Sequence, residues 1–314
     1  MLVGFTHKED SGRSYFMTRS DDSWDIKTGV GSTAVIVAAM RAEEARSPAP
    51  LVRDEFAELL ISAPELRELR ETMSAEWASS AEHQEDYRRL VSYHAVRTHF
   101  FDRFCAESST AGIEQFVILA AGLDSRAYRL AWGKGTTVFE LDMPDILAFK
   151  SATLALHRSE PSATRVEVGV DLRTDWPVAL RERGFDAAAP TAWLLEGLLP
   201  FLDPHAQHAI FDQIDGLSAR GSRVGAEDYS GVGLRQAIAN QRDAGDPAGR
   251  SDLELGDLWT DDTDANCAVW FGARGWHGEV LDSRRESERL GRPVPSLLRH
   301  GDPVFSNFIT AVKQ

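Results

Sequence analysis

The stretch from Gln115 to Asp142, QFVILAAGLDSRAYRLAWGKGTTVFELD, constrains the fold more than any other part of this chain. An unbroken apolar run over Phe116–Leu119 predicts a strand that is covered on both faces, as in parallel α/β sheets. A tight turn of small residues and a short helix follow, and a second strand over Thr137–Leu141 ends on Asp142. Small residues let a ligand approach the backbone, and a carboxylate after the second strand can bind two ribose hydroxyls. The stretch therefore predicts a half-fold that binds a nucleoside.

The turn after the first strand is compatible with two cofactors, S-adenosylmethionine and NAD. A dinucleotide site prefers the spacing G-x-G-x-x-G, because pyrophosphate needs exposed backbone N–H groups at a helix N-terminus. Here the turn is Ala120, Ala121 and Gly122, followed closely by Asp124. The Asp124 carboxylate would repel pyrophosphate but would attract an amino group, which favours S-adenosylmethionine over NAD. A nicotinamide dehydrogenase, or a βαβ unit without any ligand, remains the alternative from this pattern alone.

Acidic residues follow all of the first five predicted strands. The later three strands are expected over Arg165–Val170, Ala192–Leu195 and Ser222–Ala226. The acidic residues after the five strands are Asp124, Asp142, Asp171, Glu196 and Glu227. Because ligands of open parallel sheets bind at the carboxyl edge of the strands, this regularity indicates a site at that edge.

The segments on either side of these strands predict the domain organisation. Helical periodicity predicts a helical cap or lid within residues 1–110, behind a mobile leader at 1–23. The cap helices are expected over Thr33–Ala45, Asp54–Ile61, Glu65–Gln84 and Tyr87–Cys105. The cap and the core at 111–314 would form one structural unit.

Residues 231–265 are rich in Gly and Asp and are expected to form an insertion, a substrate lid, after the fifth strand. Two more strands are expected over Gly278–Leu281 and Val304–Val312, with a charged turn at Ser283–Leu290 between them. A strand pair after five βα units suits the α/β, Rossmann-like class I methyltransferase fold, which has a seven-stranded, mostly parallel sheet with helices on both faces.

Composition excludes several classes of protein. A net charge of −15 argues against a nucleic-acid partner, because phosphate binding needs clustered Lys and Arg. The two cysteines, Cys105 and Cys267, have no disulfide-scaffold or metal-ligand spacing, so no metal is expected. No apolar run reaches the length of a membrane span or signal peptide, so we expect a cytoplasmic protein without a membrane partner.

Several separated motifs, spread nearly end to end, resemble the actinobacterial S-adenosylmethionine-dependent O-methyltransferases related to leucine carboxyl methyltransferase. The motifs are WDIKTGVGSTA (24–34), LVRDEFAELL (51–60), AVRTHFFDRF (95–104), ILAAGLDSRAYRL (118–130), VFELDMP (138–144), VDLRTDWPVAL (170–180), WLLEGLLPFL (193–202) and GARGW (272–276). Together and in this order they are specific for the family, although not for a substrate. Two positions depart from its pattern: Ala120 stands where the family usually has Gly, and Phe201 replaces a common Tyr.

The resemblance implies S-adenosylmethionine as the cofactor, with S-adenosylhomocysteine as its product, and a role for each matching residue. Arg97 would pair with the carboxylate of the cofactor, for which a guanidinium fork is well shaped. The remaining residues would be Ala120, Ala121, Gly122 and Asp124 around the methionine part, Asp142 at the ribose, Met143 against the adenine, Asp171 and Leu172 at the adenine edge, and Glu196 near the amino group or the sulfonium.

The expected function is methyl transfer to an oxygen of a small molecule, preferably a carboxylic acid of secondary metabolism. Methyl transfer from a sulfonium is an in-line displacement, so catalysis depends on positioning and desolvation. A carboxylate is already ionised at pH 7 and needs no base, whereas a phenol or alcohol would profit from one. The candidates for a base are His94, His99 and Tyr229, and none has a supporting motif. Alternatives are a hydroxyl methyltransferase, a protein C-terminal carboxylate as acceptor, and a cofactor-binding protein without activity; homo-oligomerisation stays open.

Overall fold

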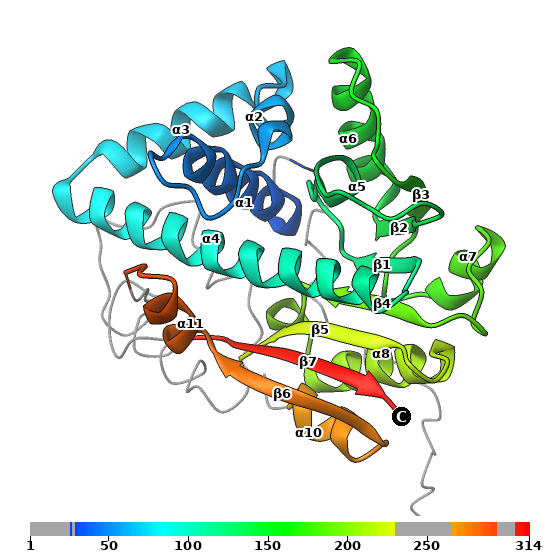
Figure 1. The fold of residues 1–314 in the computed structure, drawn as a ribbon. Coiled ribbons are helices and arrows are strands. Elements are labelled where there is room, and N and C mark those ends of the chain that lie inside the picture. The colour runs from blue at the N-terminus through cyan, green and yellow to red at the C-terminus, as the bar shows by residue number, and fades with distance from the viewer. Residues whose placement is uncertain (1–25, 27–28, 230–265, 294–304) are drawn as a thin grey trace, which may run out of the picture.

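The structure is a computed structural model that describes residue 26 and residues 29–229, 266–293 and 305–314 (Figure 1). The leader expected at 1–23 and the lid expected at 231–265 lie outside the described residues. No helix in the described part of the chain is long and apolar enough to cross a membrane.

Seven strands form one sheet in the order β3-β2-β1-β4-β5-β7-β6. The strands are β1 (Gln115–Leu119), β2 (Thr137–Asp142), β3 (Thr164–Gly169), β4 (Thr191–Leu195), β5 (Arg223–Asp228), β6 (Trp276–Asp282) and β7 (Asn307–Lys313). The first five pair in parallel, and β7 runs antiparallel to both of its neighbours. The predicted seven-stranded, mostly parallel sheet is therefore confirmed, and its order reverses between β1 and β4.

Helices cover both faces of this sheet. They are α1 (Gly29–Arg46), α2 (Glu55–Ile61), α3 (Arg67–Ala78), α4 (Ala81–Thr110), α5 (Arg126–Arg129), α6 (Pro144–Leu156), α7 (Trp176–Glu182), α8 (Pro204–Leu217), α10 (Cys267–Gly272) and α11 (Ser283–Arg289), with 3₁₀ turns η1 (Pro64–Leu66) and η2 (Leu199–Phe201). In Figure 1, α1, α2 and α3 lie together above the long helix α4, whereas β5, β7 and β6 lie below it.

The side-chain period of β1 divides the core into two layers. Its five residues are all buried, which explains the unbroken apolar run in the sequence. Phe116 and Ile118 pack with the apolar side chains of α4, whereas Val117 and Leu119 pack with those of α7, α8 and α10. Successive strand residues point to opposite faces, so both layers are anchored by one five-residue strand.

The helix α4 links the predicted cap to the sheet. Its first half contacts α1 and α3, and its second half packs on β4, β5 and β7. Its length of 30 residues exceeds the predicted Tyr87–Cys105, because Ser80 caps the start of the helix by accepting a hydrogen bond from the N–H of His83. The single helix expected over Glu65–Gln84 is wrong, because α3 ends at Ala78 and α4 begins at Ala81.

The charged turn expected at Ser283–Leu290 is also wrong, because these residues form the helix α11. Asp282 caps its first turn through the N–H of Arg284, and Glu286 pairs with Arg289 three residues later. Two of the charges that suggested a turn, Glu286 and Arg289, are thus paired along a helix that buries Glu286 together with Ser283 and Ser287. The helix α10, capped by Asn266, was not predicted.

Candidate functional site

A cavity of about 170 Å³ opens at the carboxyl ends of β1, β2 and β4. Its walls come from α1, from α4, from the segments that follow these three strands and from Tyr229 after β5. This is the position where the strand order reverses, and there the connections from neighbouring strands leave in opposite directions. The predicted residues Arg97, Ala120, Ala121, Gly122, Asp124, Asp142 and Glu196 all line the cavity, as do His94 and Tyr229.

The turn after β1 is shaped by two residues in the left-handed region. Ala120 has φ 53° and Gly122 has φ 46°. A Cβ on Gly122 would lie 3.0 Å from the Cβ of Ala34 on α1, so this position has no room for a side chain. The small residues therefore serve two purposes, since they permit the turn and let α1 approach it.

Replacing Ala120 with glycine is expected to be tolerated. Alanine in a left-handed conformation is strained by roughly 1–2 kcal/mol, and glycine would remove this strain. The relief would offset the roughly 0.5–1 kcal/mol that glycine costs through its greater freedom in the unfolded chain. Urea unfolding of the Ala120→Gly variant should give a free energy of unfolding within about 1 kcal/mol of wild type. A loss of more than about 2 kcal/mol would mean that the methyl group makes an essential contact.

Asp142 ends β2 beside this turn. Its Oδ2 accepts a hydrogen bond of 2.6 Å from the N–H of Gly122, and its Oδ1 accepts one of 2.7 Å from the N–H of Met143. Burial raises the pKa of Asp142, although these two N–H groups act in the opposite direction. Each oxygen keeps a further lone pair, so the carboxylate can still accept hydrogen bonds from a pair of ligand hydroxyls.

Asp124 is engaged within the protein. Its Oδ1 accepts a 2.6 Å bond from the N–H of Arg126, and its Oδ2 is bound by Nη1 of the same arginine. Burial alone would raise the pKa of Asp124, but Arg126 and Lys150 outweigh it and hold the pKa at about 2. Any attraction that Asp124 exerts on a ligand amino group is therefore shared with Arg126.

Stability should fall in acid because of Asp124. Its folded pKa of about 2 lies below the unfolded value near 4, so its contribution is present above pH 4 and is lost as the pH falls through about 2. The loss amounts to roughly 2 kcal/mol. Urea unfolding of wild type and Asp124→Asn at pH 6 and pH 2.5 checks this, because the stability gap between them should narrow in acid. A gap independent of pH would contradict it.

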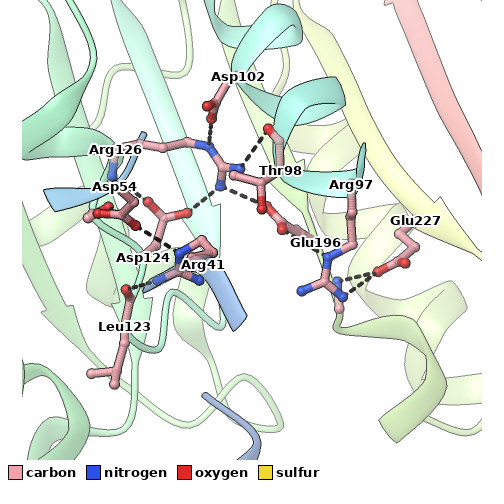
Figure 2. Close-up of polar contacts among 12 residues, drawn as sticks. Arg41, Asp54, Arg97, Thr98, Asp102, Leu123, Asp124, Arg126, Glu196 and Glu227 are labelled. Carbon is pink, nitrogen blue, oxygen red and sulfur yellow. Dashed lines mark hydrogen bonds and ion pairs between the residues drawn. The ribbon is translucent and has the colours of Figure 1, made fainter. Parts of the chain in front are cut away.

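Arg97 holds two carboxylates together, the buried Glu227 and the partly buried Glu196. Its Nε donates to Oε1 of Glu196 at 3.0 Å, and its Nη1 donates to Oε2 of Glu227 at 3.2 Å (Figure 2). Burial opposes the charge of Arg97, but Glu227 and Glu196 keep its pKa above the usual value. The N–H of Gly197 and the hydroxyls of Tyr93 and Tyr229 also donate to Glu227. Glu227, which does not line the cavity, thus holds the guanidinium of Arg97 in place.

A second set of ion pairs, also drawn in Figure 2, surrounds Arg126. Its Nε donates to Asp102 on α4 at 2.8 Å, and its Nη1 lies 2.7 Å from Oε2 of Glu196. Glu196 therefore lies between Arg97 and Arg126, where its two oxygens face different arginines. Both arginines are almost fully buried, so their positions and that of Glu196 are mutually determined.

Asp54 connects the cap to the turn after β1. Its Oδ1 caps α2 through the N–H groups of Phe56 and Ala57, while its Oδ2 accepts from Nε of Arg41 and from Oγ of Ser125. Arg41 in turn donates from Nη2 to the carbonyl of Leu123 at 2.6 Å. The wall that α1 contributes is thereby attached to the loop that carries Asp124.

Four predicted residues do not line the cavity. Met143 precedes α6, Asp171 is held by the guanidinium of Arg173, and Leu172 packs against the apolar layer under α7 and α8. His99 is half-buried on α4, away from the cavity lining. Their roles at the adenine, and that of His99 as a base, stay predictions.

The sequence analysis noted Glu227 after the fifth predicted strand but gave it no role in binding, and it did not name Arg41. Arg41 could not have been found, because its contact with Leu123 joins residues 82 positions apart. Within the described ranges, no three His, Cys, Asp or Glu side chains form a group that could hold a metal ion.

The sheet order and the position of the cavity define a Rossmann-like class I methyltransferase fold. The structure is similar to a solved structure from Thermobifida fusca YX, titled a "putative methyltransferase", with a TM-score of 0.51 and 18% sequence identity. The likeness covers 82% of this chain and 93% of that one, and it bears on the fold alone.

Sequence comparison gives the family. The family model for leucine carboxyl methyltransferase matches residues 34–215. A Mycobacterium marinum protein named "putative S-adenosyl-L-methionine-dependent methyltransferase" is 47% identical over 309 residues, covering 94% of this chain and 98% of the relative. A protein of the same name from Mycobacteroides abscessus is 45% identical over 299 residues, covering 94% and 96%. The chain belongs to the leucine carboxyl methyltransferase family, and the prediction of an S-adenosylmethionine-dependent methyltransferase is confirmed.

Proposed function

We propose that this protein is an O-methyltransferase that converts a small-molecule carboxylic acid into its methyl ester, in secondary metabolism. When bound, S-adenosylmethionine supplies an electrophilic methyl group, which leaves sulfur as its bond to the carboxylate oxygen forms. The products are the neutral ester and S-adenosylhomocysteine, and no proton is transferred. The part of the enzyme is to hold both partners in line and to exclude water.

The residues of the cavity fit this cofactor. Asp142 has lone pairs left for the ribose hydroxyls beside the turn at Ala120–Gly122. Arg97 uses Nε and Nη1 for Glu196 and Glu227, and a guanidinium has five N–H donors, so donors remain for a carboxylate. Glu196 and Asp124 contribute negative charge near a ligand that carries a sulfonium and an amino group.

The observation that carries the choice of acceptor is that every carboxylate lining the described cavity already has donors. Asp124 is bound by Arg126, Asp142 by two backbone N–H groups, and Glu196 by Arg97 and Arg126. Tyr229 is no better as a base, since burial and the neighbouring Glu227 raise its pKa well above the usual value. Such a site favours an acceptor that is already ionised at neutral pH. The name of the matched family, leucine carboxyl methyltransferase, supports the same choice.

The test uses S-adenosylmethionine that carries a tritiated methyl group. The purified protein is incubated with carboxylic acids and, separately, with the corresponding phenols and alcohols, and the extracted product is treated with alkali. Methyl esters release volatile tritiated methanol, whereas methyl ethers do not. Alkali-labile product from the acids supports the proposal. Alkali-stable product from phenols or alcohols, at a rate that rises above pH 7, would replace it with the hydroxyl alternative.

Calorimetry separates the remaining alternatives. Titration with S-adenosylmethionine and with NAD should show micromolar binding of the first alone. Binding of S-adenosylmethionine without methylation of any acid, phenol, alcohol or C-terminal peptide would favour a cofactor-binding protein without activity. A small-molecule acceptor, a cytoplasmic location and the absence of nucleic-acid and membrane partners remain parts of the proposal.

A further inference from the structure

The structure leaves His94 on α4 without a hydrogen bond to any described residue, although it lines the cavity. Its side chain is 4% exposed, and its Nδ1 is buried without a partner. The ring packs edge-on against Tyr93, with centroids 5.3 Å apart. A buried polar group without a partner costs roughly 1–3 kcal/mol, and because His94 lines the cavity, a ligand bound there would offset this cost.

The position of His94 on α4 shows which part of a ligand it would meet. Leu90, Tyr93, His94 and Arg97 follow the spacing of one helix face, and all four line the cavity. Arg97 lies one turn beyond His94 toward the residues proposed for the cofactor, and Leu90 lies one turn away on the other side. Segment 200–202 adds Pro200, Phe201 and Leu202 to the lining. His94 therefore stands where a charged part of the cavity meets an apolar part.

The charges around His94 decide which protonation state it has. Burial, Arg97 on its own helix and Arg41 on α1 all lower its pKa well below the usual value. The other ionisable side chains of the cavity lining are Tyr93, Tyr229, Asp124, Asp142 and Glu196, and each has donors or acceptors of its own. A neutral imidazole that is difficult to protonate is a poor base, but it still offers one N–H donor.

We propose that His94 binds the acceptor, donating its ring N–H to the carboxylate of an acid whose apolar body lies toward Leu90 and Phe201. This rests on the proposed function and adds to it a specificity-determining residue and a class of substrate, the apolar carboxylic acids. His94 holds the acceptor oxygen in place and takes no proton. The hydrogen bond also explains how an anion could be kept in a cavity with so much apolar wall.

The test measures ligand binding to the protein saturated with S-adenosylhomocysteine. The probes are phenylacetate and its neutral counterpart 2-phenylethanol, titrated by calorimetry. The variants are His94→Leu, which removes the donor, and His94→Gln, which keeps one. His99→Leu, on the same helix but outside the cavity lining, is the matched control.

His94→Leu should weaken phenylacetate binding at least about tenfold, while His94→Gln and His99→Leu should stay within about threefold of wild type. Binding of 2-phenylethanol and of S-adenosylhomocysteine should be unchanged in all three. The inference is overturned if His94→Leu binds phenylacetate normally, if both probes lose affinity equally, or if the wild-type complex does not bind phenylacetate. Failure of the wild type to bind S-adenosylhomocysteine would instead overturn the proposed function.

Discussion

Replacing Arg97 with alanine is expected to weaken S-adenosylmethionine binding at least about tenfold, a loss of ~1.4 kcal/mol or more. The variant should also lose about 3–5 kcal/mol of unfolding free energy, because Glu227 would remain buried without its arginine partner and Glu196 would keep only Arg126. Calorimetry measures the first effect and urea unfolding the second.

Two comparisons distinguish a contact with the cofactor from a purely structural role. Arg97→Lys keeps the charge but loses the fork, so it should recover more of the stability than of the affinity. The ligand 5′-methylthioadenosine lacks the methionine carboxylate, so its affinity should change little in folded Arg97 variants. Equal losses for both ligands would show that Arg97 supports the cavity without binding the carboxylate.

Asp142→Ala is expected to lower S-adenosylmethionine affinity at least about tenfold through the lost ribose hydrogen bonds. Whereas Arg97 forms ion pairs, the hydrogen bonds that Asp142 accepts from the described residues come from the backbone N–H groups of Gly122 and Met143. The effect on affinity should therefore exceed the effect on stability. Asp145→Ala is the matched control, because Asp145 is an exposed carboxylate only three residues away on α6. Unchanged affinity in Asp142→Ala would remove Asp142 from the site.

The sequence predicted the elements that repeat a simple physical pattern. Strands β1 and β4 are unbroken apolar runs because both faces are buried, and the acidic residues after four of the first five strands lie in or directly behind the cavity. Asp171 is the exception, because it follows β3, the edge strand that lies two positions away from β1. The strand-end rule thus located the site before its individual contacts were known.

Contacts between distant segments could not be predicted in this way. The sequence places Arg97 on a predicted helix, but helical periodicity cannot reveal that Glu196 and Glu227 bind its guanidinium. From the sequence, Asp124 was expected to attract a ligand amino group, but in the structure Arg126 already binds its carboxylate. The partners of Arg97 are fixed by tertiary packing, whereas Asp124 is bound by a residue only two positions later whose orientation the sequence does not reveal.

The contacts of Asp54 affect how inactive variants of this protein would be interpreted. Its carboxylate joins α2, Arg41 and Ser125, and through Arg41 it reaches the carbonyl of Leu123. Random mutagenesis scored by lost activity would therefore find Asp54 together with Asp142, although Asp54 does not line the cavity. Measured turnover alone would misclassify it as a catalytic group. In this protein, loss of activity would identify residues that hold the cavity walls in place as well as residues that bind the ligands.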